Sequence, residues 1–311
     1  MDISVVIPIY NEADNILPLT QRLRAVMQQM NLSYEFIFIN DGSKDNSLAV
    51  IKTLASTATS IKYLDLSRNF GHQIAVMAGL DEALGKAVVI IDADLQDPPE
   101  LILDLYQKMQ EGYEVVYAKR KKRKGESTAK RWTAHLFYRF LSSITPIDIP
   151  LDTGDFRIID QKVVKILRQM PEQNKYLRGQ IAWIGFNQSF VSYERQHRNA
   201  GDTGYTFSKM LRLAWDAVTG FSNFPLKVVS YFGFITSIIA FLVMLFTLYS
   251  RLVLKAATVP GWASLMISVL FIGGVQMIAI GIIGEYLSRV NQNVRNRPLY
   301  IVKDSNIEEK P

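Results

Sequence analysis

Carboxylates directly follow a short apolar run in the stretch Ile90-Ile91-Asp92-Ala93-Asp94-Leu95-Gln96-Asp97-Pro98-Pro99-Glu100, where four of eleven residues are acidic. Asp92 and Asp94 are two residues apart, so an extended backbone directs both side chains to the same side. Two carboxylates this close repel each other unless a cation lies between them. Oxygen ligands favour a hard divalent ion, Mg²⁺ or Mn²⁺. The alternative is a polar turn before a helix that begins at Pro98-Pro99-Glu100.

The apolar run before these carboxylates, residues 87–91, is mostly β-branched and is typical of a parallel strand buried on both faces. Carboxylates cannot stay inside such a strand, so we expect them at its carboxyl end, where open α/β sheets bind ligands. Apolar runs followed by polar residues recur at 3–12 and 36–45, and apolar residues at helical spacing lie between them, in 16–30. Further strands are predicted at 61–66 and 114–117. The sequence therefore predicts a doubly wound, mostly parallel α/β sheet with its polar strand ends at one edge.

Two long uncharged runs, 228–250 and 263–283, occupy the last third of the chain. Each could cross a hydrocarbon core of about 30 Å as a helix, and we expect membrane-spanning helices at about 228–250 and 263–285. The short link between them predicts a transmembrane hairpin over 228–287 with both ends on one side. Lys and Arg are more frequent near the hairpin's ends than in its link, which predicts a multi-pass protein of the inner (plasma) membrane with the N-terminal domain and both termini cytoplasmic.

Basic residues are concentrated in one segment. The net charge is +6, but Lys119–Arg131 holds eight Lys or Arg and one Glu, a local +7, which leaves −1 for the remainder. This segment is interpreted either as a solvated surface loop or as a contact to anionic lipid headgroups or a lipid phosphate. Nucleic acid is not expected as a partner, because no platform of aromatic and basic residues accompanies the run. Cysteine is absent, which excludes disulfides and thiolate-ligated metals.

The predicted organisation has four parts. Residues 1–206 form a cytoplasmic domain, and residues 288–311 form a cytoplasmic tail after the hairpin. Between domain and hairpin, residues 207–227 mix apolar positions with Lys209 and Arg212, which predicts helices lying in the membrane interface. An ordinary amphipathic core helix is the alternative. Glycines at 273, 274, 281 and 284 could allow close helix packing within the hairpin or in a homo-oligomer.

Six ordered motifs span nearly the whole chain, and together they resemble glycosyltransferase family 2, in particular its polyisoprenyl-phosphate glycosyltransferases, the group of dolichol-phosphate mannose synthase and the bactoprenol glucosyltransferases. The motifs are Ser4-Val5-Val6-Ile7-Pro8-Ile9-Tyr10-Asn11-Glu12, Asn40-Asp41-Gly42-Ser43, Ser67-Arg68-Asn69-Phe70-Gly71-His72, the acidic stretch at 92–100, Thr153-Gly154-Asp155-Phe156-Arg157 with His197-Arg198, and Gly284-Glu285-Tyr286-Leu287 with Arg297-Pro298-Leu299-Tyr300-Ile301-Val302. The resemblance implies an A-type glycosyltransferase fold, which is Rossmann-like.

The resemblance also implies a nucleotide-sugar donor site. Its positions for the base and ribose correspond to Pro8, Tyr10, Glu12 and Asp41. Asp94 is the main candidate metal ligand, with Gln96 assisting, and Asp92 contacts the nucleoside or the metal. The departing diphosphate develops negative charge that a divalent metal can stabilise as a Lewis acid. Asp97 and Glu100 are interpreted as helix-start residues favoured by the helix dipole.

The acceptor implied by the resemblance is a polyisoprenyl phosphate. A phosphate monoester has its second pKa near about 6, so it is largely dianionic at neutral pH and already nucleophilic. Asp155 matches the family's acceptor-site carboxylate, and its role stays open between proton acceptor and orienting group. Basic side chains that could bind the acceptor or donor phosphates are Arg157, Arg178, Arg198, Lys130 and Lys209, although Arg157 could simply pair with Asp155.

The resemblance implies inverting transfer of one hexose, most simply glucose from UDP-glucose, to undecaprenyl phosphate. The Gln-x-x-Arg-Trp motif of processive family members is absent and only two spans are predicted, which favours a single transfer. The enzymatic alternative is transfer of mannose from GDP-mannose to a dolichyl or polyprenyl phosphate. The other alternative is a non-catalytic membrane scaffold or lipid-translocating subunit that keeps the nucleotide fold.

Overall fold

A computed structural model describes residues 1–120, 153–194, 224–252 and 261–307. The described chain forms two units, one from residues 1–120, 153–194 and 296–307 and the other from 224–252 and 261–295. Residues 207–223 of the predicted 207–227 segment and most of the basic segment lie outside the described residues, and residues 224–227 begin the first helix of the second unit.

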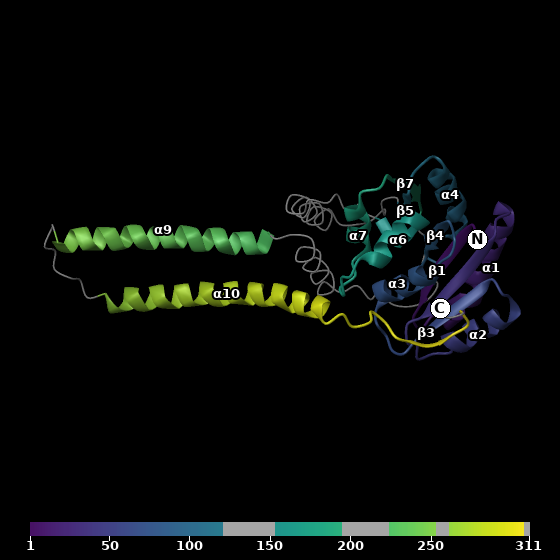
Figure 1. The fold of residues 1–311 in the computed structure, drawn as a ribbon, viewed down its shortest axis with the longest axis horizontal. Coiled ribbons are helices and arrows are strands. Elements are labelled where there is room, and N and C mark those ends of the chain that lie inside the picture. Colours follow the sequence, from purple (N-terminus) through teal and green to yellow (C-terminus); the bar gives the residue numbers. More distant parts are fainter. Residues whose placement is uncertain (121–152, 195–223, 253–260, 308–311) are drawn as a thin grey trace. The chain divides into compact units, whose positions relative to one another are not determined.

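The first unit is built on an eight-stranded sheet with the order β7-β5-β6-β4-β1-β2-β3-β8 (Figure 1). Neighbouring strands β1 to β4 are parallel, whereas β6 and β8 run antiparallel to their neighbours. The predicted α/β class with a mostly parallel sheet is confirmed. The strands are β1 (Ile3–Ile9), β2 (Tyr34–Asn40), β3 (Ile61–Leu66), β4 (Ala87–Ile90), β5 (Val115–Arg120), β6 (Thr153–Asp160), β7 (Gln188–Tyr193) and β8 (Val302–Ser305).

Helices cover both faces of this sheet, and each face has its own apolar core. One core joins the sheet to α1, α2 and α4, and the other joins it to α3, α6 and α7. Successive β1 residues alternate between the cores, with Val5 and Ile7 in the first and Val6 in the second, as the two-residue period of a strand requires. The helices are α1 (Ala13–Met30), α2 (Ser47–Thr57), α3 (His72–Glu82), α4 (Ile102–Gln110), α6 (Gln161–Gln169) and α7 (Leu177–Ile184), and the 3₁₀ turn η1 (Pro99–Leu101) precedes α4.

Helix α3 packs unusually close to the sheet. A Cβ at Gly79 would lie 2.4 Å from Cγ1 of Val6 and 2.6 Å from Cδ1 of Ile39. A larger side chain at this position would push the helix away from β1 and β2. Gly79 therefore sets the distance of α3 from the strands whose carboxyl ends form the site described below.

The end of the chain returns to the first unit. β8 pairs antiparallel with β3 and is the last strand on that side of the sheet, and the Ser67 N–H donates to the carbonyl of Ile301 at 2.9 Å. The Tyr300 hydroxyl donates to Asp81 Oδ2 on α3 at 2.9 Å. Residues 296–307 thus add the last strand to the sheet of the N-terminal domain. The sequence predicts only a cytoplasmic tail for residues 288–311 and does not predict this strand.

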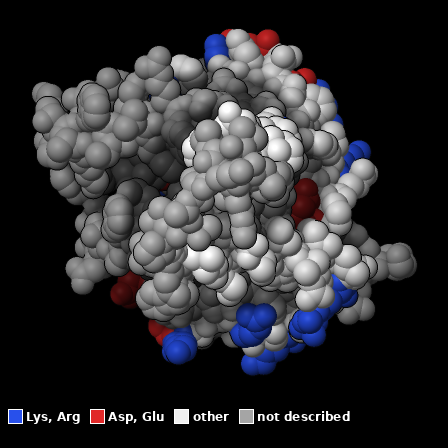
Figure 2. All heavy atoms as spheres, turned by 90° about the vertical axis from the view of Figure 1, so that its left-hand side faces the viewer, with Lys and Arg blue, Asp and Glu red and all other residues white. Residues whose placement is uncertain are grey.

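The second unit contains two long helices, α9 (Phe224–Leu252) and α10 (Trp262–Val294), which lie side by side in opposite directions (Figure 1). By length and composition both could cross a membrane, over Phe224–Val243 and Phe271–Val294. Their large apolar side chains are exposed, for example Phe246 and Met277 at 69% each. Viewed from the left-hand side of Figure 1, the described atoms nearest the viewer are uncharged (Figure 2). Soluble proteins rarely expose apolar surface on this scale, and exposed apolar surface of this kind marks a site of interaction with a membrane or another protein.

Candidate active site

The carboxyl ends of the parallel strands and the start of β6 meet at one edge of the sheet. β1 leads into Tyr10, β2 into Asp41 and β4 into Asp92. In the antiparallel β4–β6 ladder Ile90 is opposite Arg157, so the same register carried two residues further places Asp92 opposite Asp155. Four segments that are far apart in the sequence thus meet at the same edge, and three of them bring acidic side chains: Asp41, Asp92 and Asp155.

The segment after β4 presents its polar side chains on one side. Asp92, Asp94 and Gln96 are half-buried, whereas the intervening Ala93 and Leu95 are buried. The Gln96 N–H donates to Asp94 Oδ1 at 3.1 Å, and Leu95 between them has a φ of +56°. A left-handed conformation costs a non-glycine residue about 1–2 kcal/mol, and such strain persists where surrounding structure enforces it. The turn that orients Asp94 and Gln96 is therefore enforced by the fold.

Asp155 is held by three basic side chains. Its Oδ1 accepts from Nη2 of Arg157 at 2.8 Å and from Nε of Arg178 at 3.2 Å, and its Oδ2 lies 3.3 Å from Nε2 of His72. Burial alone would raise the pKa of this carboxyl, but the contact with His72 and the charges of Arg178 and Arg157 hold it well below its usual range. Asp155 is therefore ionised at neutral pH.

Asp92 has the opposite electrostatic environment. Burial and the nearby carboxylates of Asp155, Asp97 and Asp94 raise the pKa of Asp92 to about 6, and His72 opposes them only in part. Burial lowers the pKa of His72, but Asp92 at 3.7 Å and Asp155 outweigh this and raise it to about 9. The side of the site near Asp92 has an excess of negative charge, and the side near Asp155 has an excess of positive charge.

The donor set near Asp92 fits a hard divalent cation. Among the described residues no three His, Asp or Glu side chains gather closely enough to form a metal site by themselves. Mg²⁺ is commonly held by one or two carboxylates together with substrate phosphates and water. The crowding that raises the pKa of Asp92 is relieved by a cation. Asp94, Asp92 and Gln96 remain the candidate ligands.

Asp41 fixes the loop that follows β3. Its carboxylate accepts from the N–H groups of Phe70 at 2.7 Å and Gly71 at 3.0 Å, and the side chain is buried. The next residue, Gly42, has a φ of +66°, and a Cβ there would lie 2.6 Å from the backbone carbon of Arg68. The structure thus gives Asp41 a role in shaping the wall of the predicted donor site.

The other predicted donor residues lie around the end of β1. Pro8 is buried in the strand, and Tyr10 is exposed. The Glu12 carboxylate accepts from Nδ2 of Asn15 at 2.5 Å, and the backbone N–H of Glu12 donates to Oγ of Ser47. Tyr10 is the side chain of this group that is most open to a ligand.

The predicted phosphate-binding residues divide into three groups. Arg157 is 1% exposed and lies with its guanidinium carbon 5.3 Å from the ring centre of Tyr117. Arg178 on α7 is 29% exposed and reaches the same carboxylate. Lys130, Arg198 and Lys209 lie outside the described residues.

The sequence did not predict the contacts of two residues at this edge, His72 and Asp97. His72 stands out in the sequence only as the last residue of the motif Ser67–His72, after the third strand, and no role was predicted for it. Asp97, expected at a helix start, instead accepts a hydrogen bond from the Tyr193 hydroxyl on β7. Glu100 forms two hydrogen bonds with Arg22, at 2.8 and 2.6 Å, and lies in η1.

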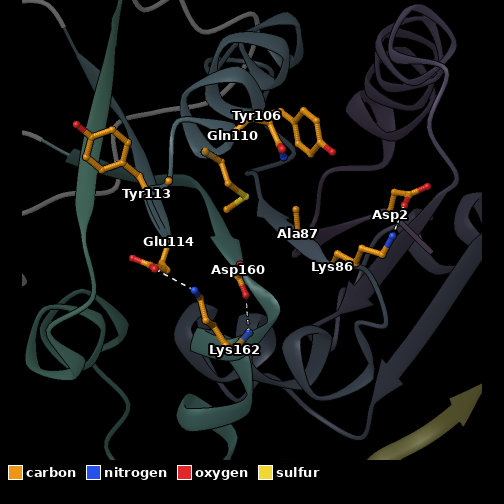
Figure 3. Close-up of a pocket in the computed structure, with 11 residues that line it drawn as sticks. Asp2, Lys86, Ala87, Tyr106, Gln110, Tyr113, Glu114, Asp160 and Lys162 are labelled. Carbon is orange, nitrogen blue, oxygen red and sulfur yellow. Dashed lines mark hydrogen bonds and ion pairs between the residues drawn. The ribbon is translucent and has the colours of Figure 1, made fainter.

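A cavity of about 410 Å³ lies at the opposite edge, where β1 and β4 begin (Figure 3). Four of its charged lining residues form ion pairs: Lys162 contacts Glu114 at 2.9 Å, and Lys86 contacts Asp2 at 3.1 Å. The fifth, Asp160, accepts from the N–H of Lys162 at 2.8 Å. None of its lining residues was predicted as a site residue. The predicted chemistry and this cavity therefore lie at different edges of the sheet.

Comparison with known proteins places this geometry in a family. Residues 4–167 match Glycosyl transferase family 2. The chain is 49% identical over 308 residues, 99% of this chain and 95% of the relative, to the uncharacterized glycosyltransferase YkcC of Bacillus subtilis (strain 168). It is 40% identical over 305 residues, 98% of each chain, to the SfII prophage-derived bactoprenol glucosyl transferase of Shigella flexneri. The chain belongs to glycosyltransferase family 2, and its predicted assignment as a glycosyltransferase is confirmed.

Proposed function

We propose that this enzyme transfers glucose from UDP-glucose to a polyisoprenyl phosphate, undecaprenyl phosphate, with inversion at the anomeric carbon. The observation that carries the proposal is the 40% identity over 98% of both chains to a protein named a bactoprenol glucosyl transferase. Two exposed apolar helices supply the means to meet an acceptor whose tail stays in a bilayer. The division of charge between Asp92 and Asp155 is consistent with separate donor and acceptor sides.

On the donor side, Asp94 and Asp92 with Gln96 would hold Mg²⁺ or Mn²⁺ against the diphosphate. The ion would act as a Lewis acid that stabilises charge on the departing nucleoside diphosphate. The loop held by Asp41 and the exposed ring of Tyr10 would bind the nucleoside. The enforced turn at Leu95 would keep Asp94 and Gln96 directed to the same side.

On the acceptor side, Asp155 acts as an orienting group. Its lowered pKa makes it a weak proton acceptor, and a phosphate dianion needs no strong base. Two guanidinium groups share this one carboxylate, which leaves net positive charge for the acceptor phosphate. Arg178 is the more exposed of the two. In this proposal it would contact the phosphate, whereas the buried Arg157 would hold Asp155 in place.

We further propose that α9 and α10 cross the inner membrane and that the site faces the cytoplasm. The chain has no native cysteine, so single cysteines can be labelled without background. A membrane-impermeant maleimide added to intact cells should label Thr258→Cys in the hairpin link and should not label Gln110→Cys on α4. The reverse pattern would place the site on the other face.

A donor panel tests the reaction itself. Purified protein in nanodiscs would be given Mg²⁺, undecaprenyl phosphate and either UDP-glucose, UDP-N-acetylglucosamine or GDP-mannose, with mass spectrometry of the lipid. We expect a hexosyl lipid from UDP-glucose and a β-configured product from this α-configured donor. Product from GDP-mannose alone would establish the mannose alternative, and no product from any donor would favour the non-catalytic alternative.

A further inference from the structure

His72 lies between the two carboxylates that define the donor and acceptor sides. Its Nε2 is 3.3 Å from Oδ2 of Asp155 and 3.7 Å from Oδ1 of Asp92. The imidazole comes from α3, whereas the two carboxylates come from β6 and from the segment after β4. One side chain therefore links three elements at the candidate active site.

The backbone at His72 is held by contacts on the side of the site that is proposed to bind the nucleoside. Asp41 accepts from the N–H of Gly71, the residue immediately before His72. The Gly71 carbonyl accepts from the N–H groups of Ile74 and Ala75, both at 3.0 Å, which starts the helix. Close packing at Gly79 then holds α3 against the sheet. These contacts hold the backbone that carries the imidazole, and none of them involves Asp92 or Asp155.

The contacts of Asp155 show what His72 contributes. Arg157 and Arg178 share Oδ1, and among the described residues His72 is the side chain that contacts Oδ2. With only Oδ1 held, the carboxylate could rotate about its Cβ–Cγ bond, and the partly exposed Arg178 would move with it. Holding both oxygens fixes the plane of the carboxylate and therefore the direction of the Arg178 guanidinium.

We propose that His72 is a positioning residue for the transfer step: by holding the second oxygen of Asp155, it sets the acceptor side at a fixed distance from the donor-side Asp92. This inference rests on the proposed transfer to a lipid phosphate. A misplacement of about 1 Å between reacting groups can lower a rate about 10²-fold. Loss of the imidazole should therefore act on turnover and leave nucleotide binding nearly unchanged.

The test compares His72→Ala, His72→Gln and Tyr300→Phe in the full-length enzyme. Glutamine keeps an N–H donor on a chain of similar reach. Tyr300→Phe removes a hydrogen bond from the other end of α3 and controls for general loosening of the helix. We expect kcat to fall about 10- to 100-fold in His72→Ala, with the KM for UDP-glucose changed less than about threefold. His72→Gln should recover most of the loss, and Tyr300→Phe should keep the wild-type kcat.

A double variant tests whether His72 acts through Asp155. Adding His72→Ala to Asp155→Asn should lower kcat little further, because the group that His72 positions is already altered. Independent, multiplicative losses would overturn the inference. So would a His72→Ala enzyme within twofold of wild type, or one whose loss follows its melting temperature and is not recovered by Gln. An inactive wild type would instead overturn the proposed function, and the inference with it.

Discussion

The two edges of the sheet use acidic side chains in different ways. At the edge where the parallel strands begin, the acidic groups have individual partners: Glu35, fully buried, accepts from Oγ of Ser4 at 2.5 Å and from the Leu84 N–H at 2.8 Å, and it pairs with Lys62 at 2.6 Å. At the opposite edge, carboxylates crowd one another around Asp92, and its burial together with these neighbours raises its pKa. The first arrangement stabilises the fold, and the second leaves charge for a ligand to neutralise.

The comparison also shows that cavity volume does not identify the site here. The cavity of about 410 Å³ lies among the paired charges, with Lys162 and Lys86 each directed at an acidic partner (Figure 3). The candidate active site is marked by uncompensated electrostatics and by an enforced turn at Leu95. Perturbed carboxyl groups at strand ends are thus the better guide to chemistry in this molecule.

The largest expected effect is that of Asp94→Ala. Removing the main candidate metal ligand should lower kcat by about 10²–10³-fold and raise the Mg²⁺ concentration needed for half-maximal rate, with little change in melting temperature. Glu100→Gln in the same acidic stretch is the matched control, because Glu100 pairs with Arg22 on the surface. Equal losses in both variants would show that the stretch matters only for folding.

Asp155→Asn should have the next largest effect. Asparagine cannot hold two guanidinium groups and an imidazole as a carboxylate does, so we expect kcat to fall about 10²-fold while UDP still raises the melting temperature. Asp160→Asn, the same substitution at the far end of β6, should leave kcat unchanged, because Asp160 only caps α6. If donor binding and turnover fell together, Asp155 would belong to the donor side instead.

Glu35→Gln tests the other edge of the sheet. The variant keeps an acceptor for Ser4 and Leu84 but loses the charge that pairs with Lys62, so we expect the free energy of unfolding to fall by about 1–3 kcal/mol. Denaturant unfolding would measure the change. The kcat at a temperature well below the melting point should stay at the wild-type value. A lowered kcat would show that this edge also contributes to the reaction.

The smallest effect is expected for Lys162→Ala in the cavity lining. Its ion pair with Glu114 is exposed, so the melting temperature should change by less than about 2 °C. Kinetic constants for donor and acceptor should not change. A clear rise in the KM of either substrate would assign the cavity to the reaction.

Local patterns in the sequence predict part of this architecture and miss the rest for a physical reason. Apolar runs that end in polar residues locate β1, β2 and β4, because burial and strand period are local properties. The antiparallel insertion of β6 beside β4 depends on pairing between distant segments, and only this register brings Asp155 to Asp92. The same applies to β8, which joins β3 from beyond the hairpin, and to His72, whose partners are more than fifteen residues away.

We propose that the carboxylate edge transfers a sugar to a lipid phosphate. The most direct test measures UDP release from UDP-glucose by the nanodisc-embedded enzyme with and without undecaprenyl phosphate, for wild type and Asp94→Ala. We predict Mg²⁺-dependent release in wild type that requires the lipid phosphate and is lost in Asp94→Ala. Release that is independent of the lipid phosphate, or that persists in Asp94→Ala, would contradict transfer to a lipid phosphate at this edge.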